Sequence, residues 1–157
     1  MPKDEKQPGD RLVTENRKAR HDYEILETYE AGMVLTGSEV KSLRAGRANL
    51  KDSYARFDRG EAFLLNAHIS PYAAASQFGH EPERNRKLLL HRAEIDKLVG
   101  RVQERGLTVI PLRIYFKAGR AKVLLGVGRG RKAYDKREAI KKREMDREAD
   151  RATGMRR

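Results

Sequence analysis

The side chains best able to bind a metal ion or move a proton are four histidines, at positions 21, 68, 80 and 91. None of them is paired at the spacing that metal sites use. The run from His80 to Arg84 is similar to part of a zinc-protease helix, but its second histidine is missing and Pro82 would break the helix. Because cysteine is absent, thiolate zinc sites, disulfides and a cysteine nucleophile are excluded. We therefore interpret the histidines as structural or surface residues and expect no bound metal.

The remaining motifs give no enzyme signature. The glycines at positions 126, 128 and 130 lack the GxGxxG spacing and no P-loop GK[ST] follows them, so a flexible hinge between a strand and a tail is favoured. No GxSxG nucleophile motif is present. Glu27 and Glu30, three residues apart on an expected strand, would face opposite sides of a sheet. We expect no catalytic residue and no cofactor, and a metal-dependent nuclease is disfavoured because it would need clustered acids.

The charge of the chain points to a polyanionic partner. Lys and Arg total 35 and Asp and Glu total 23, which gives a net charge of +12. Nucleic acid is favoured over a membrane surface, because the basic C-terminal segment has few bulky apolar residues for an amphipathic face. The alternative is a domain that is simply basic. No apolar run reaches the roughly 20 residues that span a bilayer and the N-terminus lacks a signal-peptide core, so a soluble cytoplasmic protein without membrane contact is expected.

Hydrophobic periodicity predicts an antiparallel β protein with about six strands and two or three helices. The expected strands are 23–30, 33–36, 52–57, 62–69, 107–117 and 120–127. The expected helices are 39–45, capped by Ser38 and ended by Gly46, and 93–105, with residues 86–91 leading into it. Residues 72–86 are expected to form a long loop. A small barrel is attractive because closure removes exposed strand edges.

Composition divides the chain into three parts. Residues 1–15 are polar, contain two prolines and are expected to be flexible. Residues 16–130 would form the folded, nucleic-acid-binding domain. Residues 131–157 hold 11 Lys or Arg against 6 Asp or Glu and few large apolar residues. We therefore expect a basic tail that is disordered when free and folds only against a partner.

Glu30 is an acid close to the basic cluster at 16–21. One interpretation is a solvated strand residue or a salt bridge to a nearby arginine. The other is a carboxylate that accepts a hydrogen bond from a base edge or a ribose 2′-hydroxyl, which would add selectivity to the affinity that phosphate contacts provide. The residues alone leave both interpretations open.

Several strings along the chain, taken in order, carry a resemblance to a known family. They are Asn16-Arg-Lys-Ala-Arg-His-Asp-Tyr23, Tyr29-Glu-Ala-Gly32, Gly37-Ser-Glu-Val-Lys-Ser-Leu-Arg-Ala-Gly46, Asn49-Leu-Lys-Asp-Ser-Tyr54, Ile69-Ser-Pro-Tyr72, Arg86-Lys-Leu-Leu-Leu-His91 and Tyr134-Asp-Lys-Arg137. No single string is specific, but the ordered set is. The chain resembles the SsrA-binding protein family, also called small protein B, of bacterial trans-translation.

The resemblance implies an oligonucleotide-binding-like antiparallel β-barrel with flanking helices. It implies a monomer that binds transfer-messenger RNA (tmRNA) at its tRNA-like domain and catalyses nothing. Elongation factor Tu would carry the complex to stalled ribosomes. There the tail would enter the decoding centre and the empty mRNA channel, contact mainly small-subunit RNA and become helical. A structural ribosomal or other RNA-binding protein with a basic extension is the alternative.

The resemblance also assigns contact residues. Those placed at RNA-recognition positions or in the first string are Asn16, Tyr23, Glu30, Leu89 and His91. Basic contacts to RNA are expected from Lys18, Arg20, His21, Lys41, Arg44 and Lys87. The expected ribosome-binding residues of the tail are Tyr134, Asp135, Lys136, Arg137, Ile140, Lys141, Lys142 and Arg143. His91 stands where some members have Asn, and Tyr134, whose ring could stack on a ribosomal base, stands where some have His.

Overall fold

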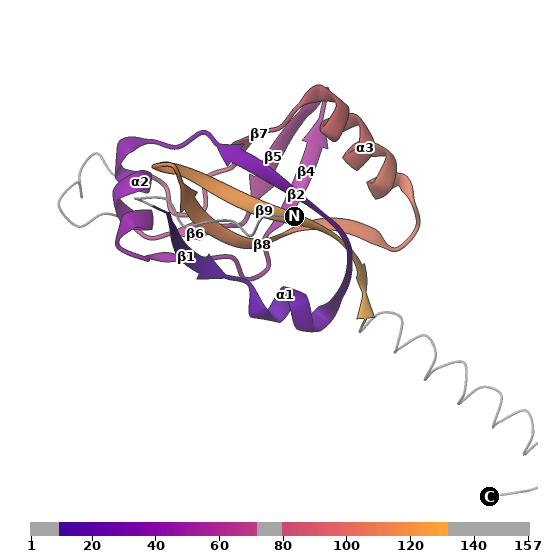
Figure 1. Cartoon of the computed structure of the whole chain (residues 1–157), viewed down its shortest axis with the longest axis horizontal. Helices are drawn as coiled ribbons and strands as arrows, with labels where there is room; N and C mark the ends of the chain where they lie inside the picture. The colour runs from indigo at the N-terminus through magenta and orange to yellow at the C-terminus, as the bar shows by residue number, and fades with distance from the viewer. Residues whose placement is uncertain (1–9, 72–79, 132–157) are drawn as a thin grey trace, which may run out of the picture.

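The structure, a computed structural model, describes residues 10–71 and 80–131. Within them the chain forms nine strands and three helices (Figure 1). The strands are β1 (Arg11–Glu15), β2 (Tyr23–Met33), β3 (Ala48–Asn49), β4 (Tyr54–Asp58), β5 (Glu61–Leu65), β6 (His68–Ile69), β7 (Arg86–Leu89), β8 (Leu107–Lys117) and β9 (Arg120–Gly130). The helices are α1 (Arg17–Asp22), α2 (Gly37–Arg44) and α3 (Arg92–Gln103). The expected basic tail and most of the expected long loop lie outside the described residues.

Seven strands form one antiparallel sheet in the order β1-β8-β9-β2-β7-β5-β4, and β3 pairs separately with β6. The long strands β8, β9 and β2 are neighbours and carry most of the pairing. β4, at one edge, packs against β8, so the sheet curls on itself. No ladder joins β4 to β1 in the described part of the chain. The expected mainly antiparallel fold with flanking helices is confirmed, as a curled sheet whose ladder stays open.

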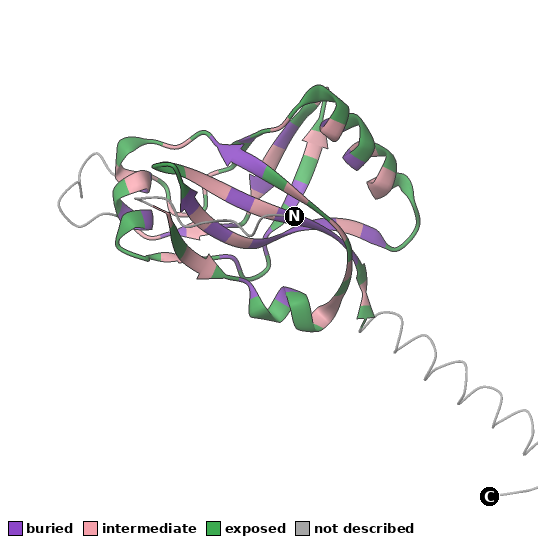
Figure 2. Ribbon diagram, in the orientation of Figure 1, coloured by how far each residue is buried: buried purple, intermediate pink, exposed green. Residues whose placement is uncertain are grey.

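The core fills the space between the strands of the curled sheet and helices α2 and α3. Alternate residues of the strands supply it, which Figure 2 shows as purple stripes. Leu64, Leu88, Ile114 and Leu125 come from four different strands and are almost fully buried. Leu98 of α3 completes this set, so the apolar stripe that predicted this helix is its packing face. Burying each side chain of this size stabilises the fold by roughly 1.5–3 kcal/mol.

One charged pair lies inside the protein. The carboxylate of Glu39, on α2, and the guanidinium of Arg86, at the start of β7, are both fully buried. Arg86 Nε donates to Glu39 Oε2 at 2.5 Å. Glu39 Oε1 accepts from Arg84 Nη2 at 2.6 Å and from the backbone N–H of Thr36 at 2.8 Å. Both carboxylate oxygens are therefore bonded, as a buried charge requires.

The Arg86 guanidinium also fixes the segments on either side of residues 72–79. Nη1 donates to the carbonyl of Ala67 at 2.7 Å, and Nη2 donates to the carbonyl of Pro82 at 3.0 Å. Burial alone would raise the pKa of Glu39, but hydrogen bonds from Arg84, from a backbone N–H and from Arg86 outweigh it and hold this pKa below its ordinary value. Burial lowers the pKa of Arg86, and the hydrogen bond and charge of Glu39 oppose this shift.

Three segments differ from their expected structure. Residues 10–15, expected to be flexible, include β1, which pairs with β8. Residues 86–91 lead into α3 as expected, but they also contain β7, which was not expected and which pairs with both β2 and β5. The strand expected at 33–36 is the end of β2, which stops at Met33. These differences arise because pairing to distant strands overrides local signals, and a buried Arg86 looks like a surface residue in sequence.

The helix cap and the hairpins refine the expectations. α2 is capped by Thr36 and not by Ser38: Thr36 Oγ1 accepts from the Glu39 N–H at 3.3 Å, and Glu39 returns a bond to the Thr36 N–H, which is a capping box. Gly46, at φ 72°, ends this helix as expected. Asn66, at φ 63°, splits the strand expected at 62–69 into β5 and β6. The second hairpin is confirmed as β8 and β9.

Gly126 and Gly128 are buried residues of β9, so the expected hinge at these positions was wrong. A Cβ on Gly126 would lie 2.9 Å from Leu112 Cδ1, and a Cβ on Gly128 would lie 3.1 Å from Tyr23 Cβ. Glycine at both positions lets neighbouring side chains of β8 and β2 lie directly on β9. The alternating glycines therefore indicate close packing and not a flexible connection.

Replacing Arg86 by Met should destabilise the protein strongly, because Oε2 of the buried Glu39 carboxylate loses the donor that Arg86 supplies. We expect a loss of about 3–5 kcal/mol in the free energy of unfolding, measured by urea titration. The matched control is Arg92→Met. Its ion pair with Asp96 is mostly exposed, so the expected loss is below about 1 kcal/mol. An equal free energy of unfolding for Arg86→Met and Arg92→Met would show that the buried ion pair is not needed for stability.

Stability should fall in acid partly through Glu39. Its pKa is lowered in the folded state, so the unfolded state binds the proton more tightly and the stabilisation is lost as pH falls below about 4.3 through the folded pKa. Glu39→Gln should be less stable at pH 7 and should show a smaller further loss between pH 5 and pH 3. Urea titrations at several pH values measure this difference, with the exposed Asp96→Asn as a control that keeps the wild-type slope.

Candidate nucleic-acid interface

The expected contact residues that the structure describes fall on three surfaces. The α1 surface consists of Asn16, Lys18, Arg20, His21 and Tyr23. The sheet surface consists of Glu30 on β2, Lys87 and Leu89 on β7, and His91 at the start of α3. The α2 surface consists of Lys41 and Arg44. The expected tail residues, 134–143, lie outside the described residues.

Asn16 is buried and uses its side chain inside the protein. Its Oδ1 accepts from the Ala19 N–H at 3.1 Å and so caps α1. Its Nδ2 donates to the carbonyls of Leu50 at 3.2 Å and Pro111 at 3.0 Å. Asn16 therefore fixes α1 against the sheet and against the segment before β4. The structure gives it a positioning role within the α1 surface.

The cations of the α1 surface are held only loosely. Lys18 Nζ lies 3.7 Å from Asp52 Oδ1, and Arg20 Nε lies 3.9 Å from Glu15 Oε1. The imidazole of His21 is exposed. Exposed pairs of this kind are worth about 0.2–1 kcal/mol, so each cation can exchange its carboxylate for a phosphate at little cost.

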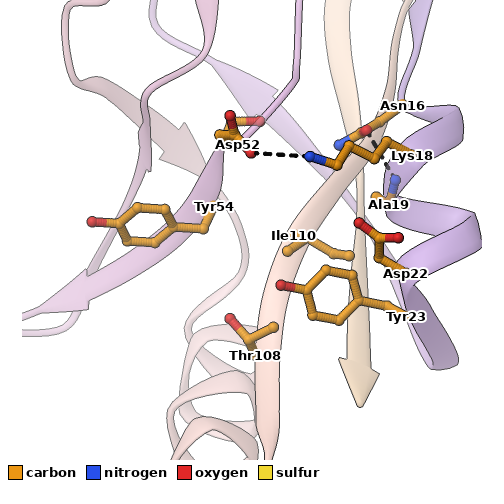
Figure 3. A pocket seen from close by; sticks show the side chains of 10 residues that line it. Asn16, Lys18, Ala19, Asp22, Tyr23, Asp52, Tyr54, Thr108 and Ile110 are labelled. Atoms are coloured by element: carbon orange, nitrogen blue, oxygen red, sulfur yellow. Dashed lines mark hydrogen bonds and ion pairs between the residues drawn. The ribbon is translucent and has the colours of Figure 1, made fainter. Parts of the chain in front are cut away.

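A cavity of about 250 Å³ opens beside α1. Tyr23 and Tyr54 lie on opposite sides of it, Lys18 and Asp52 meet at its rim, and Ile110 lies between the two rings (Figure 3). Aromatic rings at a basic surface are platforms on which nucleic-acid bases stack. Tyr54 was not among the expected contact residues, although it ends one of the strings that carry the family resemblance.

Glu30 on the sheet surface is bonded to side chains of β8. Its Oε2 accepts from the Tyr115 hydroxyl at 2.5 Å and lies 3.5 Å from Lys117 Nζ. Its ion-pair partner is thus a lysine and not the arginine considered above. The Glu30 side chain remains 36% exposed, so the bonded carboxylate is still open to a ligand.

A row of paired residues crosses four strands of the sheet surface. Tyr115 pairs with Lys122, Lys122 with Gly32, and Gly32 with Leu89. Leu89 is 53% exposed although it is apolar. Gly32 is buried under the Leu89 side chain, because a Cβ on Gly32 would lie 3.3 Å from Leu89 Cβ.

The other members of the sheet surface surround this row. His91 follows the end of β7 by two residues and is the N-cap of α3. The His91 N–H donates to Glu94 Oε1 at 3.1 Å, which fixes the start of α3. Lys87 is exposed and its Nζ lies 3.6 Å from Glu61 Oε2. The sheet surface therefore combines one carboxylate, one imidazole, one apolar side chain and one cation, Lys87.

The α2 surface lies at the C-terminal end of its helix. The guanidinium of Arg44 lies 4.7 Å from the centroid of the Phe116 ring, which orients it by a cation–π contact. The backbone carbonyl of Arg44 accepts from the guanidinium of Arg11 on β1. Lys41 is exposed one turn earlier. The strand that the sequence did not predict thus adds a further cation, Arg11, next to this surface.

Sequence reasoning missed the side chains of β8 and β9 that face the same way as Glu30. These are Tyr115, Lys117 and Lys122. A signal was present, because Arg113, Tyr115 and Lys117 alternate with buried residues in an expected strand. The sequence does not show that this strand lies two places from β2.

Other polar groups serve the fold. His80 Nδ1 lies 2.8 Å from Ser38 Oγ, and Nε2 lies 2.8 Å from the Ile69 carbonyl, which fits the structural role expected for it. In residues 10–71 and 80–131, no three His, Asp or Glu side chains are grouped to hold a metal ion. Among the described helices, none has the length and apolarity needed to cross a membrane.

Replacing Asn16 by Asp tests its positioning role. Asp keeps the oxygen that accepts from Ala19 but presents a second oxygen to the carbonyls of Leu50 and Pro111. We expect the free energy of unfolding to fall by about 1–3 kcal/mol for each carbonyl left without its donor. The control Lys18→Met, which changes only an exposed cation of the same helix, should stay within about 0.5 kcal/mol of wild type in the same urea titration. A stable Asn16→Asp would show that these bonds are dispensable.

Comparison with known proteins identifies relatives over nearly the whole chain. A family model described as SmpB protein matches residues 13–155. An SsrA-binding protein of Geobacillus sp. (strain WCH70) is 58% identical over 152 residues, which are 97% of this chain and 96% of the relative. An SsrA-binding protein of Desulforudis audaxviator (strain MP104C) is 61% identical over 143 residues, which are 91% of this chain and 94% of the relative.

A solved structure agrees with these relatives. The work that describes it is named "tmRNA-SmpB: a journey to the center of the bacterial ribosome". It superposes with a TM-score of 0.65 at 58% sequence identity and covers 74% of this chain and 82% of the other. The chain therefore belongs to the SmpB protein family.

Proposed function

We propose that this chain binds tmRNA at its tRNA-like domain and delivers it to stalled ribosomes in trans-translation. The observation that carries the proposal is family membership across residues 13–155, with relatives named for SsrA binding. A structural neighbour at 58% identity is described with tmRNA and the bacterial ribosome, which supports the same partners. The expected contact residues supply a basic, largely exposed set of side chains for a folded RNA.

The three surfaces would contribute differently to the affinity and the selectivity of RNA binding. Lys18 and Arg20 on the α1 surface and Lys41 and Arg44 on the α2 surface supply exposed cations for phosphates, which give affinity without sequence information. The sheet surface combines Glu30 with an imidazole and an apolar side chain, which suits recognition of ribose hydroxyls and base edges. Affinity would thus come from several surfaces, and selectivity mainly from the sheet surface.

The remaining parts of the proposal concern the ribosome. Residues 131–157 would enter the decoding centre and the empty mRNA channel, contact mainly small-subunit RNA and become helical there. Elongation factor Tu would join through the tmRNA complex. The protein would act in the cytoplasm as a monomer, without a cofactor and without catalysing a reaction. The net charge of +5 on these residues supports contact with ribosomal RNA.

Two variants, each expected to lose a different activity, test the proposal. Lys18→Met with Arg20→Met should weaken tmRNA binding about tenfold or less at physiological salt and reduce the salt dependence, because two phosphate contacts are removed. A chain that ends at Arg131 should bind the tRNA-like domain within a few-fold of wild type, yet fail to support tagging of peptides on stalled ribosomes. Fluorescence anisotropy with labelled tmRNA and a tagging assay measure the two losses, and Arg92→Met on α3 is the charge control.

Other results would exclude the proposal. Wild-type protein that binds tmRNA no better than an unrelated folded RNA of equal length would exclude specific tmRNA binding. Protein that stays on every ribosome in equal amount through a high-salt wash would indicate the alternative, a structural ribosomal component. A rescue factor should instead be substoichiometric and enriched on stalled ribosomes.

A further inference from the structure

Two side chains of β8 hold one oxygen of Glu30. The Tyr115 hydroxyl donates to Oε2 at 2.5 Å, and Lys117 Nζ lies 3.5 Å from the same oxygen. Among the described residues, neither a hydrogen bond nor an ion pair engages Oε1 of this carboxylate. With 36% of its side chain exposed, Glu30 can receive a donor from another molecule.

Tyr115 reaches Glu30 across a whole strand. β9 lies between β8 and β2, where Tyr115 pairs with Lys122 and Glu30 pairs with Leu124. Two strand spacings amount to roughly 10 Å, which these side chains can span only by extending toward each other over β9. The guanidinium of Arg113 lies 5.6 Å from the centroid of the Tyr115 ring and packs against it. Arg113 therefore holds the Tyr115 ring in the position from which its hydroxyl donates to Glu30.

This arrangement has an effect that a lone surface carboxylate lacks. A glutamate side chain has three rotatable bonds, and a ligand that needs one orientation loses affinity when it has to freeze them. The bonds to Oε2 fix the carboxylate before a ligand arrives. The positive charge of Lys117, 3.5 Å from Oε2, also offsets the repulsion between this carboxylate and the phosphates of an approaching RNA.

We propose that Tyr115 and Lys117 are positioning residues that orient Glu30 so that its Oε1 accepts one hydrogen bond from RNA. The donor is an O–H or N–H group, either a ribose 2′-hydroxyl or an amino or imino group of a base edge. The inference rests on the proposed function, because it names residues that prepare the sheet surface for the same RNA. It assigns Tyr115 an action through Glu30 and not a direct contact with a base.

A double-mutant cycle in the full-length protein tests this assignment. Tyr115→Phe removes a single hydroxyl and keeps the ring. We expect tmRNA binding, measured by fluorescence anisotropy, to weaken about tenfold or more for Glu30→Ala and about threefold to tenfold for Tyr115→Phe. In the Glu30→Ala background, Tyr115→Phe should cost less than twofold, since the acceptor of the hydroxyl is already gone.

Lys117→Met should behave in the same way with a smaller effect, about twofold to fivefold alone and little in the Glu30→Ala background. Lys97→Met, an exposed lysine of α3 outside the three surfaces, is the charge control and should leave binding nearly unchanged. Thermal unfolding of every variant should stay within about 2 °C of wild type, because all the bonds concerned are exposed. A loss of binding that follows a loss of folding would overturn the positioning role.

The outcomes separate this inference from the proposed function. Wild-type protein that does not bind tmRNA overturns both. Wild-type binding that Glu30→Ala leaves unchanged keeps the proposed function and overturns the inference. Equal losses from Tyr115→Phe with and without Glu30 also overturn it, because the hydroxyl would then act on RNA directly. A large loss for Tyr115→Ala but none for Tyr115→Phe would assign the ring to stacking and overturn it as well.

The two possible donors are distinguished by RNA analogues. Wild-type protein is challenged with pools of tmRNA that carry either 2′-deoxynucleotides or inosine, which lacks the guanine amino group, at scattered positions. Interference at a site that disappears in Glu30→Ala identifies the group that Oε1 accepts from, and that site should disappear in Tyr115→Phe too. A site that disappears in Glu30→Ala but persists at full strength in Tyr115→Phe overturns the positioning role.

Discussion

The buried ion pair between Glu39 and Arg86 is the constraint on which the arrangement of the other elements depends. A carboxylate removed from water needs partners for both of its oxygens, and these come from the first turn of α2 and from residues 84 and 86. A buried guanidinium needs acceptors, and it finds them in carbonyls before and after residues 72–79. The pair therefore ties together α2, the start of β7 and the backbone at Ala67 and Pro82.

Because the buried ion pair fixes the position of β7, it also determines which side chains of β7 are exposed. With Arg86 and Leu88 turned inward, the alternation of the strand turns Lys87 and Leu89 outward. Pairing with β2 then sets Leu89 beside Gly32, and α3 begins three residues later, at Arg92. The buried ion pair between Arg86 and Glu39 thus helps to determine which side chains lie together on the sheet surface. The same logic holds at α1, where the buried amide of Asn16 places exposed cations.

Much of the fold could be predicted from local patterns, and the failures have physical causes. α3 and the hairpin of β8 and β9 were predictable because their apolar residues repeat at helical or strand spacing. β7 was not, because a buried arginine has no signature of its own in a sequence. The expected contact cations came from composition and resemblance, and their contact with RNA stays a prediction; the structure shows that Lys18, Arg20, Lys41 and Arg44 are exposed. The partners of Glu30 were not predictable, because Tyr115 lies 85 residues away in the chain and two strands away in the sheet.

The pairing of β9 with β2 has a consequence for whatever follows the sheet. Their ladder runs from Gly32↔Lys122 to Tyr23↔Gly130, with one bulge near Ile25, so the last residues of β9 leave the sheet alongside the first residue of β2. Backbone hydrogen bonds of this ladder thus hold the end of β9 next to α1. Along a strand, successive side chains point to opposite faces of the sheet, so a shift of one residue reverses their orientation. A length change of one residue in β9 would therefore turn the side chains that follow it, up to Gly130, to the opposite face of the sheet.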